Sequence, residues 1–336
     1  MIRGFRFFPA IARKYRRCNQ VTGSLHPMSM SKRVLATIAL GVALVGPAQA
    51  QRSSRYEVMD DAVITRTLSF AAGGPPHDAG KRVAGTPGGR TLDVRNINGF
   101  IHVEATTDST VQLSIRKVIR AATREDLADA ERDVRLDFRD GAARVEATVI
   151  DRRGQICGEP SRDDGERWER VHYEVRFDFT IRVPRDAAIR LCTINGGDVV
   201  VNGTRGDFDV TNVNGPVEMN QVAGSGRAHT VNGGVKVSFT ANPKAPSSFK
   251  TVNGNVDVWF RDGFGADFAM KTFNGRLFTD FETQPLAAAA PAAVERRNGK
   301  FVHRVNEFTR VRVGGGGPEM KFETLNGNVR ARRSER

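Results

Sequence analysis

Three acidic side chains lie shortly after repeated Asn-Gly pairs in the second half of the chain: Glu218, Asp257 and Asp280. Two carboxylates that face each other can act as general acid and base on a glycosidic bond. These three form no evident pair, and Lys236 and Arg276 stand at similar places, which favours a mixed, solvated face. We therefore predict no catalytic residues and expect a non-enzymatic protein. An envelope polysaccharide-processing enzyme is the alternative.

The sequence also lacks the spacing of a metal or phosphate site. The histidines after residue 50 are scattered without ligand spacing: His77, His102, His172, His229 and His303. The acidic run at 163–166 lacks the alternating ligands of a calcium loop. The glycines at 314–317 lack the Gly-Lys-Ser/Thr of a phosphate loop and are typical of a linker. We expect neither a metal nor a cofactor.

One aromatic residue is a candidate contact for a ligand. Trp259 lies between Val258 and Phe260 in a segment that alternates in hydrophobicity, so we expect its side chain to point outward. An outward tryptophan offers a flat apolar face to a sugar or a protein partner. The alternative is that Trp259 packs beneath the later insertion.

The first fifty residues have the features of a secretory signal. A basic stretch at 31–33 precedes an apolar run at 34–46, and Pro47-Ala48-Gln49-Ala50 resembles an Ala-x-Ala cleavage site. The run is shorter than the ~20 apolar residues of a spanning helix. We predict cleavage after Ala50, an over-extended start at 1–27, and no membrane span after cleavage. The mature protein is then expected in the periplasm, at the outer membrane or outside the cell.

The charge balance follows from the same segment. The 336 residues include 51 Lys and Arg against 38 Asp and Glu, a formal charge of +13. Eight of the basic residues and none of the acidic ones lie in the first fifty positions, so the rest carries only +5. No basic patch is interleaved with aromatic residues, which disfavours nucleic-acid binding.

Export also determines how the cysteines are interpreted. Cleavage removes Cys18 and leaves Cys157 and Cys192 in an oxidising compartment, where a pair can form a disulfide. In the chain-entropy model, closing a loop of this size stabilises the fold by roughly 3 to 4 kcal/mol. Two unpaired buried thiols are the alternative, because spacing alone does not test the geometry.

A short motif repeats through the chain: a small polar residue, a hydrophobic one, then Asn-Gly. From Asn195 to Asn274 the steps between motifs are 19, 18, 21 and 21 residues, the spacing of a solenoid with about twenty residues per coil. The motif asparagines and threonines are Asn98, Asn195, Asn214, Asn232, Asn253, Asn274, Asn326, Thr193, Thr230, Thr251, Thr272 and Thr324.

Apolar residues alternate with polar ones on both sides of each motif, which predicts one strand before the Asn-Gly corner and one after it. Asn-Gly tolerates a positive φ and suits the sharp turn between them. The constant period favours stacked coils with parallel strands over a series of hairpins. Stacked asparagines can then form a ladder of amide hydrogen bonds about 4.8 Å apart, and the threonines can do likewise. We prefer this structural role to binding of sugar or ice by the asparagines.

The other segments are assigned by composition and alternation. Residues 51–89 are interpreted as a flexible lead-in with one candidate strand at 63–70. A strand-rich part at 90–186 includes one short helix capped by Thr123-Arg124-Glu125-Asp126. The repeats occupy 187–283. An insertion covers 284–318, with a strand pair at 300–305 and 309–313, and 319–336 is the last coil and tail.

The repeated Thr-hydrophobic-Asn-Gly-x-Val-x-Val and the preceding Val183-Pro184-Arg185-Asp186-Ala187 resemble the bacterial putative-adhesin family of β-strand-repeat proteins, a domain of unknown function. The resemblance covers roughly 91–283 and 319–333. It implies an all-β, single-stranded β-helix-like solenoid that is exported. It brings no catalytic residues to this sequence.

Three functions are compatible with these features. The first is a non-enzymatic, adhesin-like binding or scaffold surface in the cell envelope, whose partner is an unknown polysaccharide or protein. The second is the polysaccharide-processing enzyme, which rests on fold analogy alone. The third is an envelope regulatory or stress-response protein that binds a protein partner through the 284–318 insertion.

Overall fold

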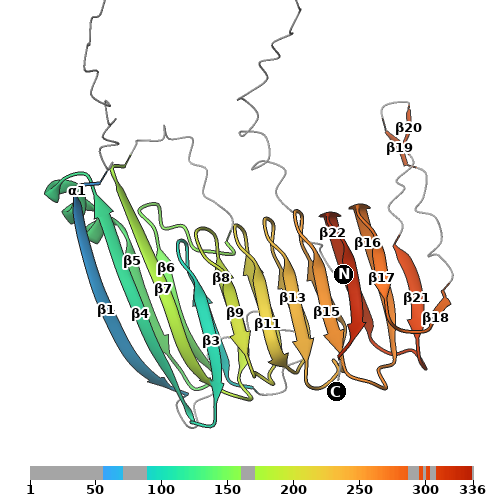
Figure 1. Cartoon of the computed structure of the whole chain (residues 1–336). Helices are drawn as coiled ribbons and strands as arrows, with labels where there is room; N and C mark the ends of the chain where they lie inside the picture. Colours follow the sequence, from blue (N-terminus) through green and yellow to red (C-terminus); the bar gives the residue numbers. More distant parts are fainter. Residues whose placement is uncertain are drawn as a thin grey trace, which may run out of the picture. The chain divides into compact units, whose positions relative to one another are not determined.

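A computed structural model describes residues 56–70, 89–159, 171–286, 295–297, 300–302 and 308–334. The expected signal region at 1–50, including Cys18, lies outside the described residues, as do His77, His303 and the acidic run at 163–166. The regular structure of the described part consists of β-strands and one short helix, so the predicted all-β class is confirmed. The strands form two large mixed sheets and one two-stranded hairpin (Figure 1).

The first large sheet has ten strands. In spatial order they are β1 (Val58–Ser69), β4 (Thr110–Ala121), β7 (Tyr173–Pro184), β3 (Ile101–Thr106), β9 (Val199–Asn202), β11 (Val217–Val222), β13 (Val235–Phe239), β15 (Val256–Phe260), β23 (Val329–Arg333) and β17 (Leu277–Thr279). From β7 to β17 every neighbouring pair is parallel. Two long antiparallel strands, β1 and β4, form the other end.

The second large sheet has eleven strands. In spatial order they are β18 (Thr283–Pro285), β21 (Thr309–Val313), β16 (Ala266–Asn274), β22 (Glu319–Asn326), β14 (Ser247–Lys250), β12 (Gly226–His229), β10 (Phe208–Asn212), β8 (Ala188–Thr193), β2 (Thr91–Arg95), β6 (Arg144–Ile150) and β5 (Arg135–Asp140). Its run from β16 to β6 is parallel. Antiparallel strands cover both ends of that run.

Each Asn-Gly corner joins one strand of the eleven-stranded sheet to the next strand of the ten-stranded sheet. We call such a strand pair a layer. In spatial order the layers are β2/β3, β8/β9, β10/β11, β12/β13, β14/β15, β22/β23 and β16/β17. Equivalent strands pair in parallel, with Val217 opposite Val199 and Val235 opposite Val217. The alternation of apolar and polar residues therefore keeps the same side chains facing the interior in every layer.

The C-terminal layer does not lie at the end of the series. Layer β22/β23 lies between β14/β15 and β16/β17, and Figure 1 shows β22 between β15 and β16. In the corner, Asn326 bridges to Asn253 and pairs with Asn274. The chain therefore skips one position between β15 and β16, and the last repeat of the sequence fills it.

The strands before residue 187 are interrupted by helix α1 (Arg124–Asp133), as the sequence predicts. Its N-cap is Thr123, whose Oγ1 accepts a hydrogen bond from the Asp126 backbone N–H at 3.1 Å. Layer β2/β3 belongs to the series of layers although β4 to β7 follow it in sequence, because β2 pairs with β8 and β3 with β9.

Two segments differ from the sequence-based expectation. In the lead-in at 51–89, the candidate strand at 63–70 is part of a longer strand, β1, which begins at Val58, pairs with β4 along its whole length and places Leu68 in the core. In the insertion, the expected pairing of 300–305 with 309–313 is not formed among the described residues. Instead β20 (Lys300–Val302) pairs with β19 (Glu295–Arg297), and β21 pairs with β16 and β18. Val311 and Val313 of β21 pack on the core, which accounts for the pairing of β21 with β16 and β18.

The core lies between the two sheets and is formed by their inward side chains. Valines dominate the earlier layers, and phenylalanines gather towards the C-terminal ones. Phe322 is fully buried, with its ring 5.5 Å from Phe249 and 5.2 Å from Phe268, centroid to centroid. These offset and edge-on contacts add to the free energy gained by burial. Phe322 thus links the C-terminal layer to both of its neighbours.

We expect Phe322→Ala to lower the free energy of unfolding by about 3 to 5 kcal/mol, because it leaves a cavity between two layers. The matched control is Phe273→Ala, since Phe273 is 76% exposed and its loss should cost less than about 0.5 kcal/mol. Urea unfolding followed by circular dichroism measures both. Equal effects of the two substitutions would contradict the burial of Phe322.

Candidate binding face and corner ladders

The corner threonines donate their hydroxyls to glycine carbonyls of the preceding layer. The Oγ1-to-O distances are 3.0 Å for Thr193–Gly99, 2.7 Å for Thr230–Gly215, 2.7 Å for Thr251–Gly233, 2.9 Å for Thr324–Gly254 and 2.8 Å for Thr272–Gly327. All except the half-buried Thr272 are buried. The expected threonine-to-threonine ladder is thus replaced by hydroxyl-to-carbonyl bonds. The physical reason is that a buried hydroxyl needs a partner and the corner carbonyl is the acceptor within reach.

The corner asparagines point outward and bond to one another. Each donates from Nδ2 to Oδ1 of the preceding layer: 2.7 Å for Asn214–Asn195, 2.8 Å for Asn232–Asn214, 2.8 Å for Asn253–Asn232, 2.7 Å for Asn326–Asn253 and 2.6 Å for Asn274–Asn326. Asn98 differs, because its Nδ2 donates to the Val175 carbonyl at 3.0 Å. The amides within the row are therefore occupied with one another on an exposed edge of the protein.

The hydrophobic residue between each threonine and asparagine lies at the surface of the corner. In most layers it is half-buried, whereas Leu325 is 45% and Phe273 is 76% exposed. Thus the threonine faces inward and the asparagine outward, an orientation that the sequence pattern left open.

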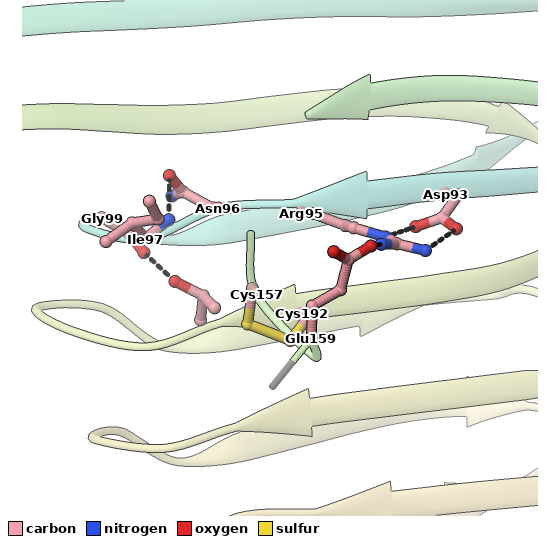
Figure 2. Close-up of a disulfide and its surroundings, with 9 residues drawn as sticks. Asp93, Arg95, Asn96, Ile97, Gly99, Cys157, Glu159 and Cys192 are labelled. Atoms are coloured by element: carbon pink, nitrogen blue, oxygen red, sulfur yellow. Dashed lines mark hydrogen bonds and ion pairs between the residues drawn. A yellow bond between two sulfur atoms is a disulfide. The ribbon is translucent and has the colours of Figure 1, made fainter. Parts of the chain in front are cut away.

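The two cysteines in the described residues lie together at the eleven-stranded sheet. Cys157 and Cys192 form a disulfide with a Cα–Cα distance of 5.7 Å, and both are buried. Figure 2 shows Glu159 and Arg95 next to it, joined by an ion pair of 3.0 Å. The bond ties the segment after β6 to strand β8.

A buried carboxylate lies next to the disulfide. Asp93 is 2% exposed and is paired with Arg95 at 3.2 Å and with Arg144, while Arg190 lies 4.0 Å away. A carboxylate at such depth is tolerated because cations and hydrogen-bond donors surround it. Every charge in this group has a structural partner, so we assign the group to the stability of the sheet.

The outer face of the ten-stranded sheet holds the candidate contact residue. Trp259 of β15 points outward, as its alternation predicts, and is half-buried. The Arg332 guanidinium of β23 lies over the indole ring, 5.7 Å from its centroid. The arginine is the register partner of Trp259 on the next strand. The guanidinium and the indole ring therefore attract each other in a cation–π contact.

A second row of side chains crosses the same face one step nearer the corner. Its register partners on β11, β13, β15, β23 and β17 are Glu218, Lys236, Asp257, Arg330 and Phe278. Arg330 bonds Asp257 at 3.0 Å and lies 5.8 Å from the centroid of the Phe278 ring. We call Lys236, Asp257, Trp259, Phe278, Arg330 and Arg332 the Trp259 face.

The candidate acids and histidines are not gathered into one centre. Glu218 and Asp257 lie two strands apart, with Lys236 between them, and Asp257 is paired with Arg330. Asp280 accepts the Arg333 backbone N–H at 3.3 Å. Among the described histidines, His102 of the ten-stranded sheet pairs with Asp198 and His229 of the eleven-stranded sheet pairs with Ser248, so the two contact different partners.

Within the described ranges, no group of three or more His, Cys, Asp or Glu side chains has the geometry to hold a metal ion. In the same part of the chain, no helix has the length and apolar character needed to cross a membrane.

No family model matches the sequence, and neither does any curated protein. Among solved structures, the chain is similar to a putative cell adhesion protein from Clostridium sporogenes ATCC 15579, with 8% identity and a TM-score of 0.40 over 82% of this chain and 100% of that one. It is also similar to a putative adhesin from Bacteroides fragilis NCTC 9343, with 11% identity and a TM-score of 0.32 over 81% and 97% of the two chains.

We expect the variant Cys157→Ala/Cys192→Ala to lose about 4 kcal/mol of unfolding free energy, because the bond closes a 35-residue loop. Urea unfolding of the variant and of the unchanged chain, without reductant, measures the difference. If reductant destabilises the unchanged chain but not the variant, the loss belongs to the disulfide. A variant as stable as the unchanged chain would contradict this prediction.

Stability should also depend on the protonation of His229. Burial, and then the charge of Arg227, lower the pKa of His229 to about 4 from its usual 6.5. Between these two pH values the unfolded chain binds a proton that the folded chain does not, so unfolding free energy falls as pH is lowered. In His229→Gln the fall from pH 7 to pH 4 should be smaller by roughly 3 kcal/mol. Identical pH profiles of the two proteins would disprove this.

Proposed function

We propose that the protein is an exported, non-enzymatic β-solenoid whose Trp259 face is an adhesin-like binding surface for an acidic polysaccharide of the cell envelope. The arrangement that carries this proposal is the pairing of an outward tryptophan with Arg332, beside Arg330 and Phe278 on the same face. Sugars bind to aromatic faces, and arginines bind carboxylates in a forked geometry. The two kinds of contact together fit a polymer of acidic sugars.

Charge on this face supports an anionic ligand. Asp257 is neutralised by Arg330, while Lys236 is exposed and Arg332 contacts only an aromatic ring among its described partners. The neighbouring Glu218 of the same row faces Lys236, so the three cations Lys236, Arg330 and Arg332 outnumber the two carboxylates Glu218 and Asp257. Because the face extends over parallel strands about 4.8 Å apart, successive residues of one extended polymer can contact successive strands.

The solenoid interpretation is supported by the parallel layers and by the motif spacing. Corner bonds link each layer to the next through threonine hydroxyls and asparagine amides. Such repetition makes a rigid surface in which each layer contacts only its neighbours. The disulfide is in keeping with export, since such bonds persist in oxidising compartments.

The alternative of a polysaccharide-processing enzyme has less support. Such chemistry needs two carboxylates that face each other, and in the described part of this face Glu218 and Asp257 are separated by the strand of Lys236. A regulatory role through the insertion would involve segments that lie partly outside the described residues.

The proposal predicts that Trp259→Ala weakens retention on polygalacturonate by about tenfold, equivalent to ~1.4 kcal/mol. Affinity electrophoresis of the full chain in gels with polygalacturonate or neutral dextran, at low and high salt, measures retention. Phe273→Ala is the matched control, because it removes an exposed aromatic ring at the corner and not on the face.

Three results would contradict the proposal. Equal retention of Trp259→Ala and of the unchanged chain would place the ligand elsewhere. Binding that disappears completely at high salt would indicate electrostatic adsorption alone. Equal retention on dextran would exclude specificity for acidic sugars.

A further inference from the structure

The C-terminal layer fills a gap that the preceding part of the chain does not close by itself. Residues before 280 form layers β14/β15 and β16/β17, and these two layers are not paired with each other. Between them lies a slot one layer wide. Residues 319–333 fill this slot and pair in parallel with both of its walls.

The filling layer supplies contacts to both sides of the slot. Met320, Phe322, Val329 and Ala331 are fully buried in it. On one wall, Thr324 donates to the Gly254 carbonyl at 2.9 Å; on the other, Thr272 donates to the Gly327 carbonyl at 2.8 Å. Without this layer, four strands would expose unpaired edges, which bind any matching strand.

The segment reaches the slot by a crossing made of glycine. Strand β21 lies on one side of β16 and β22 on the other, so residues 314–318 pass over the start of β16. A Cβ at Gly317, where φ is +157°, would lie 2.6 Å from the Gly265 carbonyl oxygen. The close approach therefore requires glycine, and a run of four glycines gives the connection freedom to extend.

We propose that this slot is an acceptor site for a Thr-x-Asn-Gly layer supplied in trans, and that a second copy of the chain supplies it by exchange of residues 319–333. The exchanged segment makes the same contacts in either arrangement, so only the glycine connection differs between monomer and dimer. The tether favours the monomer at low concentration, and mass action favours the exchanged dimer at high concentration. This inference is independent of the ligand proposed for the Trp259 face.

The test uses two full-length variants that each carry one new cysteine. Ser248 of β14 and Lys321 of β22 are register partners on neighbouring strands. Ser248→Cys and Lys321→Cys chains are mixed at high concentration, unfolded in urea, refolded together without reductant and oxidised. Adjacent strands are about 4.8 Å apart, within the Cα separation of a disulfide. We expect a species of doubled mass in light scattering, with positions 248 and 321 linked between chains.

The matched control replaces Ser248→Cys with Arg227→Cys. Arg227 lies on β12, which is separated from β22 by β14, so its thiol should not link to position 321. Chains that stay monomeric at every concentration would overturn the proposal. So would a dimer in which the 248–321 linkage is absent, or one in which position 227 links to 321 equally well.

A second variant tests the connection. Deleting Gly314 and Gly315 shortens the crossing over β16, so a chain should no longer fill its own slot. We expect its molar mass to double at concentrations where the unchanged chain is monomeric. Ser248→Cys and Lys321→Cys are then introduced together into this shortened chain. If the chain stays monomeric and the two cysteines still link within one molecule, the role of the glycines is overturned. If the shortened chain does not fold, the mixed-chain experiment decides.

Discussion

The close approach of corner backbones is the constraint on which the structure depends. At Gly233, where φ is +155°, a Cβ would lie 2.4 Å from the Gly215 carbonyl oxygen of the adjacent layer. Only a glycine corner lets the Thr251 hydroxyl reach the Gly233 carbonyl and the asparagines meet outside it. This contact fixes the register, and a register shift of one residue would turn every valine of a strand outward.

Much of this could be predicted from the residues, because local patterns report local structure. The Asn-Gly corners, the alternating strands, the Thr123 cap and the outward side of Trp259 all follow from periodicity and turn chemistry. The order of the layers could not be predicted in this way. Asn232 and Asn253 are adjacent layers 21 residues apart, yet Asn253 and Asn274, with the same spacing, lie two layers apart. All layers have similar edges, so sequence distance does not reveal which edges meet.

The candidate site depends on the same long-range event. Arg330 and Arg332, which flank Phe278 and Trp259, both lie on β23 and reach this face only because the C-terminal layer is inserted beside β15. No periodicity within the strand of Trp259 indicates a partner 73 residues away. The face is therefore complete only when the slot is filled, which links surface chemistry to the completion of the core.

The asparagine row has one further property. Every Nδ2 donates in the same sense along the layers, from Asn274 through Asn326 to Asn195. Aligned amides polarise one another, so each bond strengthens the next. The row therefore has electrical polarity, with an amide donor at the Asn195 end and a carbonyl acceptor at the Asn274 end. Like the axis of a helix, this edge of the protein has a positive and a negative terminus, although no helix runs along it.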